Sequence, residues 1–213
     1  MTPLLLGHRG ARASLQIAEN TLASFELCLR HGCDGFEFDV RLSADGRPVV
    51  CHDASVGGLE IKNAASTILS IPALEDVLCE FAHRAFLDIE LKVVGSEAQT
   101  LTQLSKYPPQ KGYVVSSFLP EVIMAIHQLD STIPLGLVCN SAEQLRGWRE
   151  IPVEWVIPHF ELADRELVKL VHAAGKRIMV WTVDNAERMR DFADLAVDAI
   201  ISGETEQLVR LRM

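Results

Sequence analysis

The segment Gly35–Val40 alternates acidic with large apolar side chains, and this alternation is the first sign of chemistry in the chain. Successive side chains of a strand point to opposite faces, so Glu37 and Asp39 share one face while Phe36 and Phe38 occupy the other. Burying two unpaired carboxylates costs free energy unless a cation or a substrate lies between them. We therefore interpret the pair as part of an active site, although a solvated edge strand would show the same alternation.

A second segment, Phe86–Lys92, repeats this pattern. Asp88, Glu90 and Lys92 fall on one face, and aliphatic residues fall on the other. Glu90 and Lys92 lie at the end of the strand, whereas Asp88 lies lower and is left outside the predicted site. Because the carboxyl ends of parallel barrel strands meet at one mouth, the acidic residues of both strands are expected to converge there.

Two histidines are placed near the same mouth. The first predicted strand ends in His8 and Arg9, and the segment Pro48–His52 follows the first acidic strand after a link too short for a parallel crossover. That link contains Asp-Gly, a strong hairpin turn. If these two residues form the turn, the residue numbers of paired positions add up to 91, so Asp39 faces His52. The hairpin is thus predicted to deliver a histidine to the carboxylates.

Short apolar strands alternate with amphipathic helical segments over nearly the whole chain, which is typical of repeated βα units. Removing the hairpin arm leaves eight strands, so we predict a (β/α)8 barrel with a short hairpin extension after the second strand, in one domain over residues 1–213. The predicted strands are Leu4–His8, Gly35–Val40, Phe86–Lys92, Tyr113–Phe118, Leu135–Cys139, Trp155–His159, Ile178–Val183 and Ala199–Ser202. The predicted helices are Thr21–Arg30, Ala73–Ala82, Glu97–Lys106, Pro120–Leu129, Ala142–Arg149, Arg165–Ala174, Ala186–Phe192 and Glu204–Leu211, with Asn20, Ser96, Ser141 and Asp164 as N-caps.

The charged groups expected at this mouth suit a metal ion together with an anionic substrate. Oxygen ligands from Glu37, Asp39 and Glu90 suit a hard divalent cation such as Mg²⁺ or Ca²⁺ rather than zinc. Together with one such cation and the basic groups of Arg9 and Lys92, a bound phosphodiester makes the site electrically neutral. A phosphodiester is therefore the expected substrate.

His8 and His52 complete this set. An unperturbed histidine has a pKa near 6.5, so two of them can divide into one neutral base and one protonated acid near neutral pH. A lone histidine at a strand end is commonly structural, but His8 lies beside Arg9 with His52 across the mouth. We expect acid/base catalysis from the pair, and which of them is the acid is left open.

The amino-acid composition limits the classes of binding partner that we expect for this chain. The chain has 213 residues with 29 acidic and 20 basic ones, a formal net charge of −9 and no basic cluster, which argues against nucleic acid and anionic membranes. Its five cysteines form no CxxC pair, which favours reduced thiols and a cytoplasmic location. Because no signal-peptide pattern and no run of about 18 apolar residues is present, we expect no stable membrane insertion. The oligomeric state does not follow from these features.

The order of these motifs resembles the glycerophosphodiester phosphodiesterase family over nearly the whole chain. The resemblance rests on His8-Arg9-Gly10, Glu19-Asn20-Thr21, Glu37-Phe38-Asp39, His52-Asp53, Glu90-Leu91-Lys92, Ser116-Ser117-Phe118 and Val180-Trp181-Thr182-Val183. It implies a (β/α)8 barrel and a metal-dependent hydrolase that converts glycerophosphodiesters to glycerol 3-phosphate and an alcohol. The roles it implies are acid/base catalysis for His8 and His52, metal binding for Glu37, Asp39 and Glu90, phosphate binding for Arg9 and Lys92, and a pocket wall near the alcohol for Trp181.

Several features leave the substrate and some roles open. The segment after His52 is shorter than the family's usual insertion, Ser202-Gly203-Glu204-Thr205 replaces the usual Thr-Asp-x-Pro, and Asp184 replaces an asparagine. The alternatives are a phosphodiesterase of the lysophospholipase D type, acting on lysophospholipids, and a non-catalytic barrel that binds a phosphate ester. For Asn20, a helix N-cap and a role in the site are equally compatible with the sequence.

Overall fold

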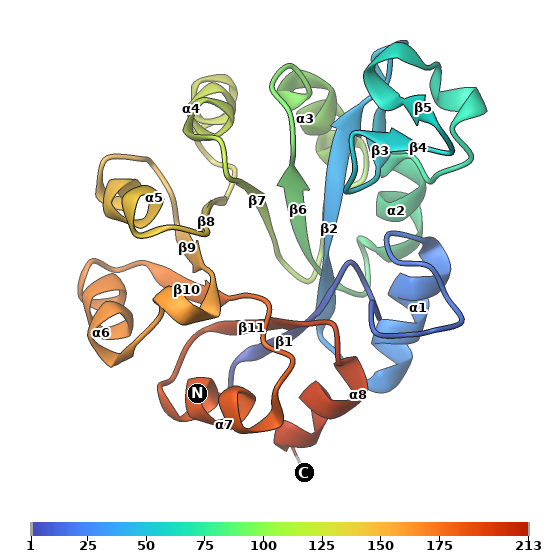
Figure 1. Ribbon diagram of the computed structural model, residues 1–213. Helices are drawn as coiled ribbons and strands as arrows, with labels where there is room; N and C mark the ends of the chain where they lie inside the picture. Colours follow the sequence, from blue (N-terminus) through green and yellow to red (C-terminus); the bar gives the residue numbers. More distant parts are fainter. Residues whose placement is uncertain (1, 213) are drawn as a thin grey trace.

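The computed structural model describes residues 2–212, and they form a closed barrel of eight parallel strands (Figure 1). Closure comes from β1, which pairs in parallel with both β2 and β11. The (β/α)8 prediction is thus confirmed. The barrel strands are β1 (Leu4–His8), β2 (Gly35–Leu42), β6 (Phe86–Leu91), β7 (Tyr113–Ser117), β8 (Leu135–Cys139), β9 (Trp155–Pro158), β10 (Arg177–Val180) and β11 (Ala199–Ser202).

Helices surround the barrel, one after each of its strands (Figure 1). Two predicted helices are split, because the segments at residues 142–149 and 205–212 each end in a tighter 3-10 turn, η3 (Gly147–Arg149) and η5 (Val209–Arg212). None of the helices within residues 2–212 is long and apolar enough to cross a membrane. The α-helices are α1 (Leu22–His31), α2 (Leu74–Phe81), α3 (Glu97–Lys106), α4 (Pro120–Leu129), α5 (Ala142–Arg146), α6 (Arg165–Ala173), α7 (Ala186–Asp194) and α8 (Thr205–Leu208).

The apolar face of β2 packs outward against the helices. Phe36 stacks on Phe25 of α1 with ring centroids 4.2 Å apart, and it meets Phe81 of α2 edge-on at 5.2 Å. Phe38 joins the same cluster. Such packed aromatic pairs stabilise the fold beyond their buried area. Since neighbouring side chains on a strand point to opposite faces, this packing turns the acidic face of β2 into the barrel.

Helix N-termini agree only partly with prediction. The side chains of Ser141 and Asp164 accept hydrogen bonds from backbone amides of the first turn, as predicted. Ser96 does not, since its hydroxyl donates to a preceding carbonyl oxygen. The cap of α1 is Thr21 rather than Asn20. Asn20 has φ +55° and its amide is engaged elsewhere, within the site described below.

The hairpin exists, but the predicted register is wrong by one residue. β3 (Pro48–Val50) pairs antiparallel with the end of β2, with Val40 opposite Val50. The loop has three residues instead of two, because Gly46 adds a left-handed position (φ +73°) after the turn. Asp39 is therefore opposite Cys51, whose amide donates to the Asp39 carbonyl at 3.0 Å, and His52 lies beyond the ladder.

The segment between β3 and α2 forms a small layer of its own. It contains the short strands β4 (Ser55–Val56) and β5 (Leu59–Glu60) and two 3-10 turns, η1 (Ile61–Asn63) and η2 (Ser66–Ile68). A separate apolar cluster that includes Val49, Ile61 and Leu69 anchors this layer to the hairpin. The loop that carries His52 is therefore supported on one side by packed structure.

Candidate active site

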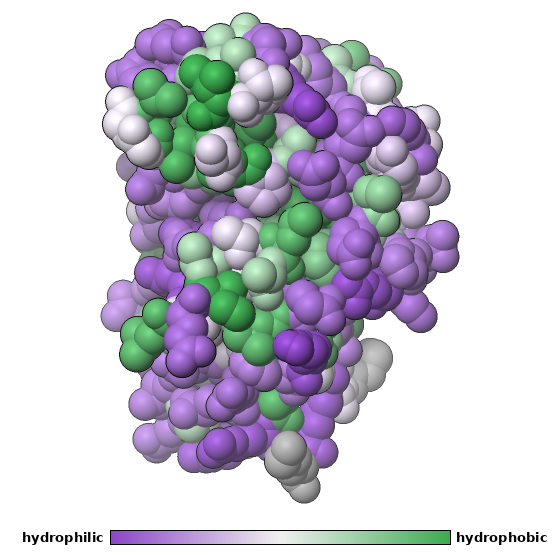
Figure 2. Space-filling model, turned by 90° about the vertical axis from the view of Figure 1, so that its right-hand side faces the viewer, coloured by the Kyte–Doolittle hydropathy of each residue, from purple (hydrophilic) through white to green (hydrophobic). Residues whose placement is uncertain are grey.

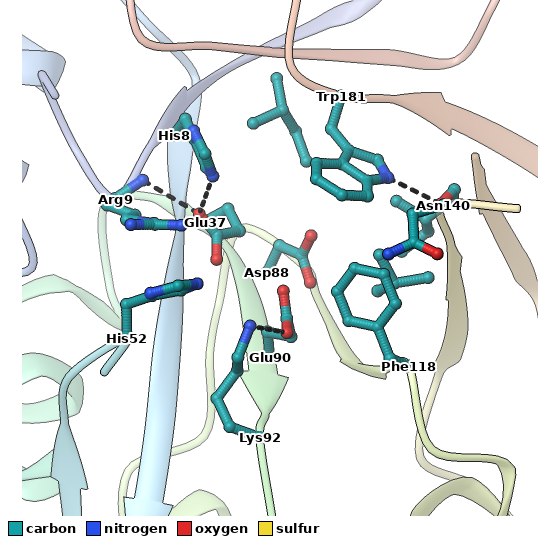
Figure 3. A pocket seen from close by; sticks show the side chains of 13 residues that line it. His8, Arg9, Glu37, His52, Asp88, Glu90, Lys92, Phe118, Asn140 and Trp181 are labelled. Atoms are coloured by element: carbon teal, nitrogen blue, oxygen red, sulfur yellow. Dashed lines mark hydrogen bonds and ion pairs between the residues drawn. The ribbon is translucent and has the colours of Figure 1, made fainter. Parts of the chain in front are cut away.

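The carboxyl ends of the barrel strands enclose a cavity of about 280 Å³ (Figure 3). Every predicted site residue except Asp39 lines it; Asp39 is buried and contacts two of the lining side chains, Arg9 and Lys92. The lining residues are His8, Arg9, Glu37, His52, Asp88, Glu90, Lys92, Phe118, Val138, Asn140, Ile157, Trp181 and Ile201.

Three buried carboxylates cluster at the floor of the site, and two of them, Glu37 and Glu90, line the cavity. Glu37, Asp39 and Glu90 each offer one oxygen atom, and these atoms lie within 4.8 Å of one another. Burial and the neighbouring carboxylates raise the pKa of Glu37 well above its usual value, and burial raises the pKa of Glu90 to about 7. Within the described chain, Glu37 Oε1 is buried without a hydrogen-bond partner. An orphaned oxygen among clustered carboxylates fits a hard divalent cation such as Mg²⁺ or Ca²⁺.

Arg9 and Lys92 bring positive charge to this floor. Lys92 Nζ lies 2.5 Å from Glu90 Oε1 and 3.2 Å from Asp39 Oδ1, and Arg9 Nε lies 3.3 Å from Asp39 Oδ2. Burial opposes ionisation of Asp39, but the charges of Lys92 and Arg9 outweigh it and lower the pKa of Asp39. Both basic side chains also line the cavity, where they can contact an anionic group.

His8 is enclosed, with 9% of its side chain exposed. Its Nδ1 lies 3.2 Å from both Arg12 Nη1 and Thr182 Oγ1, and its Nε2 lies 3.8 Å from Glu37 Oε2. Burial, followed by the charges of Arg9 and Arg12, lowers the pKa of His8 to about 3. The imidazole is therefore neutral at neutral pH and can accept a proton.

His52 has a more open environment, with 37% of its side chain exposed. Its Nδ1 lies 2.8 Å from Asp53 Oδ1, which orients the ring so that the other nitrogen is directed at the cavity (Figure 3). Its backbone carbonyl accepts hydrogen bonds from Arg41 Nε and Nη2 at 2.8 and 2.6 Å. The two predicted histidines thus reach the same cavity from the end of β1 and from the loop after β3.

Asn20 belongs to the site rather than to the helix cap. Its Nδ2 donates to Asp39 Oδ2 at 2.8 Å, and the Asp39 amide donates to its Oδ1 at 3.3 Å. The positive φ of Asn20 suits asparagine, which enters the left-handed region more readily than most residues. This side chain fixes the orientation of a candidate metal ligand, a role that the sequence left open beside the N-cap.

Asp88 was not predicted to belong to the site. It lines the cavity, and its Oδ1 accepts a hydrogen bond from Ser116 Oγ at 2.6 Å. Burial raises the pKa of Asp88 to about 7, and the charge of Glu90 adds to this effect. The sequence signal for this position was that Asp88 shares a strand face with Glu90. How deep the cavity reaches cannot be read from one strand.

The opposite wall of the cavity is largely apolar (Figure 3). The rings of Phe118 and Trp181 meet edge-on with centroids 5.4 Å apart, and Trp181 Nε1 donates to the Ile157 carbonyl at 3.0 Å. Asn140 adds an amide to this wall. The cavity therefore has a charged side that suits a phosphate group and an aromatic side that suits the rest of an ester.

A (β/α)8 barrel with clustered carboxylates, two basic side chains and two histidines at its mouth fits an enzyme that acts on a phosphate ester. Residues 8–62 and 60–207 match the model of the glycerophosphoryl diester phosphodiesterase family. The chain belongs to this family.

Individual relatives and solved structures are consistent with membership of this family. The chain is 28% identical over 240 aligned positions to a glycerophosphodiester phosphodiesterase of Caldanaerobacter subterraneus, covering 99% of this chain and 98% of the relative. The crystal structure of the glycerophosphodiester phosphodiesterase of Thermotoga maritima is similar, with a TM-score of 0.86, 25% identity and coverage of 100% and 99%. An Oleispira antarctica phosphodiesterase, solved in complex with the product sn-glycerol-3-phosphate, has a TM-score of 0.85, 25% identity and coverage of 98% and 96%.

Proposed function

We propose that this enzyme hydrolyses glycerophosphodiesters to glycerol 3-phosphate and an alcohol, by metal-dependent chemistry with His8 and His52 as the acid/base pair. The observation that carries the proposal is the placement of two histidines with contrasting environments beside one cluster of three carboxylates. The similar phosphodiesterase that binds sn-glycerol-3-phosphate supports the identity of the product.

The two parts of the substrate bind to different sides of the cavity, the phosphoryl group to the charged side and the alcohol portion to the aromatic side. Arg9 and Lys92 hold the phosphoryl oxygens, and Trp181 packs against the alcohol portion. Glu37, Asp39 and Glu90 are the residues that would hold Mg²⁺ or Ca²⁺. A bound divalent cation supplies charge stabilisation to the phosphoryl group.

His8 acts as the base in the first step. This step requires the tautomer in which Nδ1–H donates to Thr182 Oγ1 and Arg12 Nη1 makes no hydrogen bond to the ring. Nε2 then takes the proton of the glycerol hydroxyl next to the phosphate, and that oxygen bonds to phosphorus. His52, oriented by Asp53, gives a proton to the leaving alcohol as its bond to phosphorus breaks. Water then opens the cyclic phosphate with the two roles reversed, and both histidines return to their starting states.

Turnover of glycerophosphocholine tests this proposal. His8→Ala and His52→Ala should each lower kcat by at least about 10²-fold, because positioned acid/base groups contribute that much or more. His83→Ala, at an exposed turn before β6, is the matched control and should retain full activity. Near-full activity of either site variant would contradict the acid/base assignment.

Chelation of divalent metal should abolish turnover of glycerophosphocholine, and added Mg²⁺ or Ca²⁺ should restore it. Turnover that is the same with and without metal would overturn metal dependence.

Lysophospholipids are a second candidate substrate, and one observation favours them. Four exposed large apolar side chains, Leu15, Leu59, Ile68 and Val94, lie in connections that leave the carboxyl ends of barrel strands, where the cavity opens. Figure 2 shows hydrophobic residues gathered on the upper part of the face that carries β4 and β5. Apolar side chains beside a mouth suit an acyl chain. Faster turnover of lysophosphatidylcholine than of glycerophosphocholine would favour this candidate, and binding of either ester without product would favour a non-catalytic barrel.

A further inference from the structure

Within the proposed function, we infer that Arg41 is a positioning residue that holds His52 where it can reach the phosphoryl group of a bound substrate. The inference rests on the acid/base role of His52 proposed above. It concerns a side chain that is not among the residues lining the cavity and that donates two hydrogen bonds to the backbone of the histidine.

His52 needs such support because it lies outside the β ladder. The last pair of the hairpin is Val40 with Val50, and the last backbone bond joins Cys51 to Asp39. Beyond this point the chain leaves the sheet, and both His52 and its neighbour Asp53 are open to solvent, with 37% and 77% of their side chains exposed. A contact between two exposed side chains orients the ring but fixes its position only weakly.

Arg41 connects His52 directly to β2. It follows Glu37 and Asp39 on the same face of β2, and it is paired with Val49 across the hairpin. Its half-buried guanidinium directs two N–H groups, Nε and Nη2, at one oxygen, the carbonyl of His52, at 2.8 and 2.6 Å.

The planar fork of arginine fixes both distance and direction, whereas a lysine ammonium is a freely rotating point charge. The strand that carries two of the candidate metal ligands, Glu37 and Asp39, therefore also positions the proposed acid through Arg41. A displacement of about 1 Å at such a group can cost about 10²-fold in rate.

The identity of the leaving group separates positioning from a merely structural role. Arg41→Met keeps the apolar stem of the side chain and removes the fork. With glycerophosphocholine, whose alcohol needs a proton to leave, its kcat should fall about 10- to 10²-fold with KM little changed. With glycerol 3-(4-nitrophenyl phosphate), whose nitrophenolate leaves unprotonated, the first-turnover release should stay close to that of the wild type.

Three further variants complete the experiment. His52→Ala should show the same dependence on the leaving group, and adding Arg41→Met to it should cause little additional loss, because both act through one group. Arg41→Lys should lie between Arg41→Met and the wild type, and it keeps the experiment informative if the methionine variant folds poorly. Arg47→Met, which changes an exposed arginine of the same hairpin, is the matched control and should behave as the wild type.

The outcomes are distinguishable. Equal losses on both substrates for Arg41→Met and Arg41→Lys, with His52→Ala still selective, would show that Arg41 only supports the fold and would overturn this inference alone. An unaffected or unselective His52→Ala would overturn the proposed acid role, and the Arg41 inference with it.

Discussion

The imidazoles of His8 and His52 line one cavity but differ in burial and in the charges of their neighbours. His8 is enclosed between cationic groups that favour its neutral form, whereas His52 is half-exposed beside the carboxylate of Asp53. A pair of titratable groups whose surroundings differ in this way can divide the roles of base and acid. The chemical assignment therefore lies in the neighbours of each ring, and those neighbours come from elements far apart in the sequence.

Asn20 offers a test of how the carboxylates are held. Asn20→Gly removes the amide that binds Asp39, and glycine adopts φ +55° without strain. Because partners of ligating carboxylates affect metal affinity by about 10- to 100-fold, we expect the Mg²⁺ or Ca²⁺ concentration for half-maximal activity to rise by that factor. Thr21→Ala, the neighbouring change, removes the α1 cap and should cost about 1 kcal/mol of stability. Equal metal requirements in Asn20→Gly and Thr21→Ala would contradict the role of Asn20.

At the scale of elements, sequence periodicity predicts the barrel well. Alternation in β2 and β6 places the acidic faces inside correctly, since their aliphatic and aromatic faces must pack against helices. The errors arise where the outcome depends on another segment. Asp-Gly is compatible with loops of two or three residues, so the position of His52 cannot be read from the turn alone. The cap at Asn20 fails because Asp39 competes for its amide. The position of Asp88 along the cavity wall could not be read from its own strand, because depth in a barrel depends on the stagger of neighbouring strands.

Close packing between β2 and β6 is what brings the carboxylates together. An added Cβ at Gly35 would lie 1.8 Å from the carbonyl oxygen of Phe86, so these strands approach too closely for any side chain there. Gly35→Ala should force the strands apart and destabilise the fold by about 3 kcal/mol or more, because backbone must move. Gly46→Ala meets no neighbouring atom and strains only a left-handed residue (φ +73°), which costs about 1 kcal/mol.

Chemical denaturation of both glycine variants measures these costs. The alanine at position 35 should also weaken metal-dependent activity, since β2 and β6 carry all three candidate ligands, whereas the hairpin variant should retain it. If the two variants were equally stable, the close approach of the strands would not limit the fold.

On the scale of the whole molecule, the site concentrates negative charge in a chain that is already acidic. The formal net charge is −9, and burial of the carboxylate cluster raises the pKa of Glu37 and of Glu90. A folded chain that holds these groups together is less stable when they ionise, because their charges are desolvated and repel one another. Any cation that binds the folded cluster therefore stabilises the entire barrel by linkage.

This linkage predicts a pH-dependent stabilisation by metal. A bound cation requires ionised Glu37 and Glu90, and Glu90, facing Asp39, Asp88, Arg9 and Lys92, has a pKa of about 7 against the ordinary 4.5. Protons compete with the cation for Glu90 and for Glu37, whose pKa is also raised, so affinity for Mg²⁺ or Ca²⁺ should rise with pH through about 7. At a metal concentration 100 times Kd the gain is about 2.7 kcal/mol, and each kcal/mol raises Tm by about 2–4 °C for a chain of this size.

Thermal unfolding with and without metal measures the effect. The rise in Tm should be larger at pH 8 than at pH 6, and it should disappear in Glu37→Gln, which removes one ligand charge from the cluster. Glu143→Gln, an exposed change in the first turn of α5, should respond as the wild type does. A rise in Tm that was equal at both pH values, or that persisted in Glu37→Gln, would mean that the cation binds outside the cluster, because only groups that release protons on binding make the affinity depend on pH.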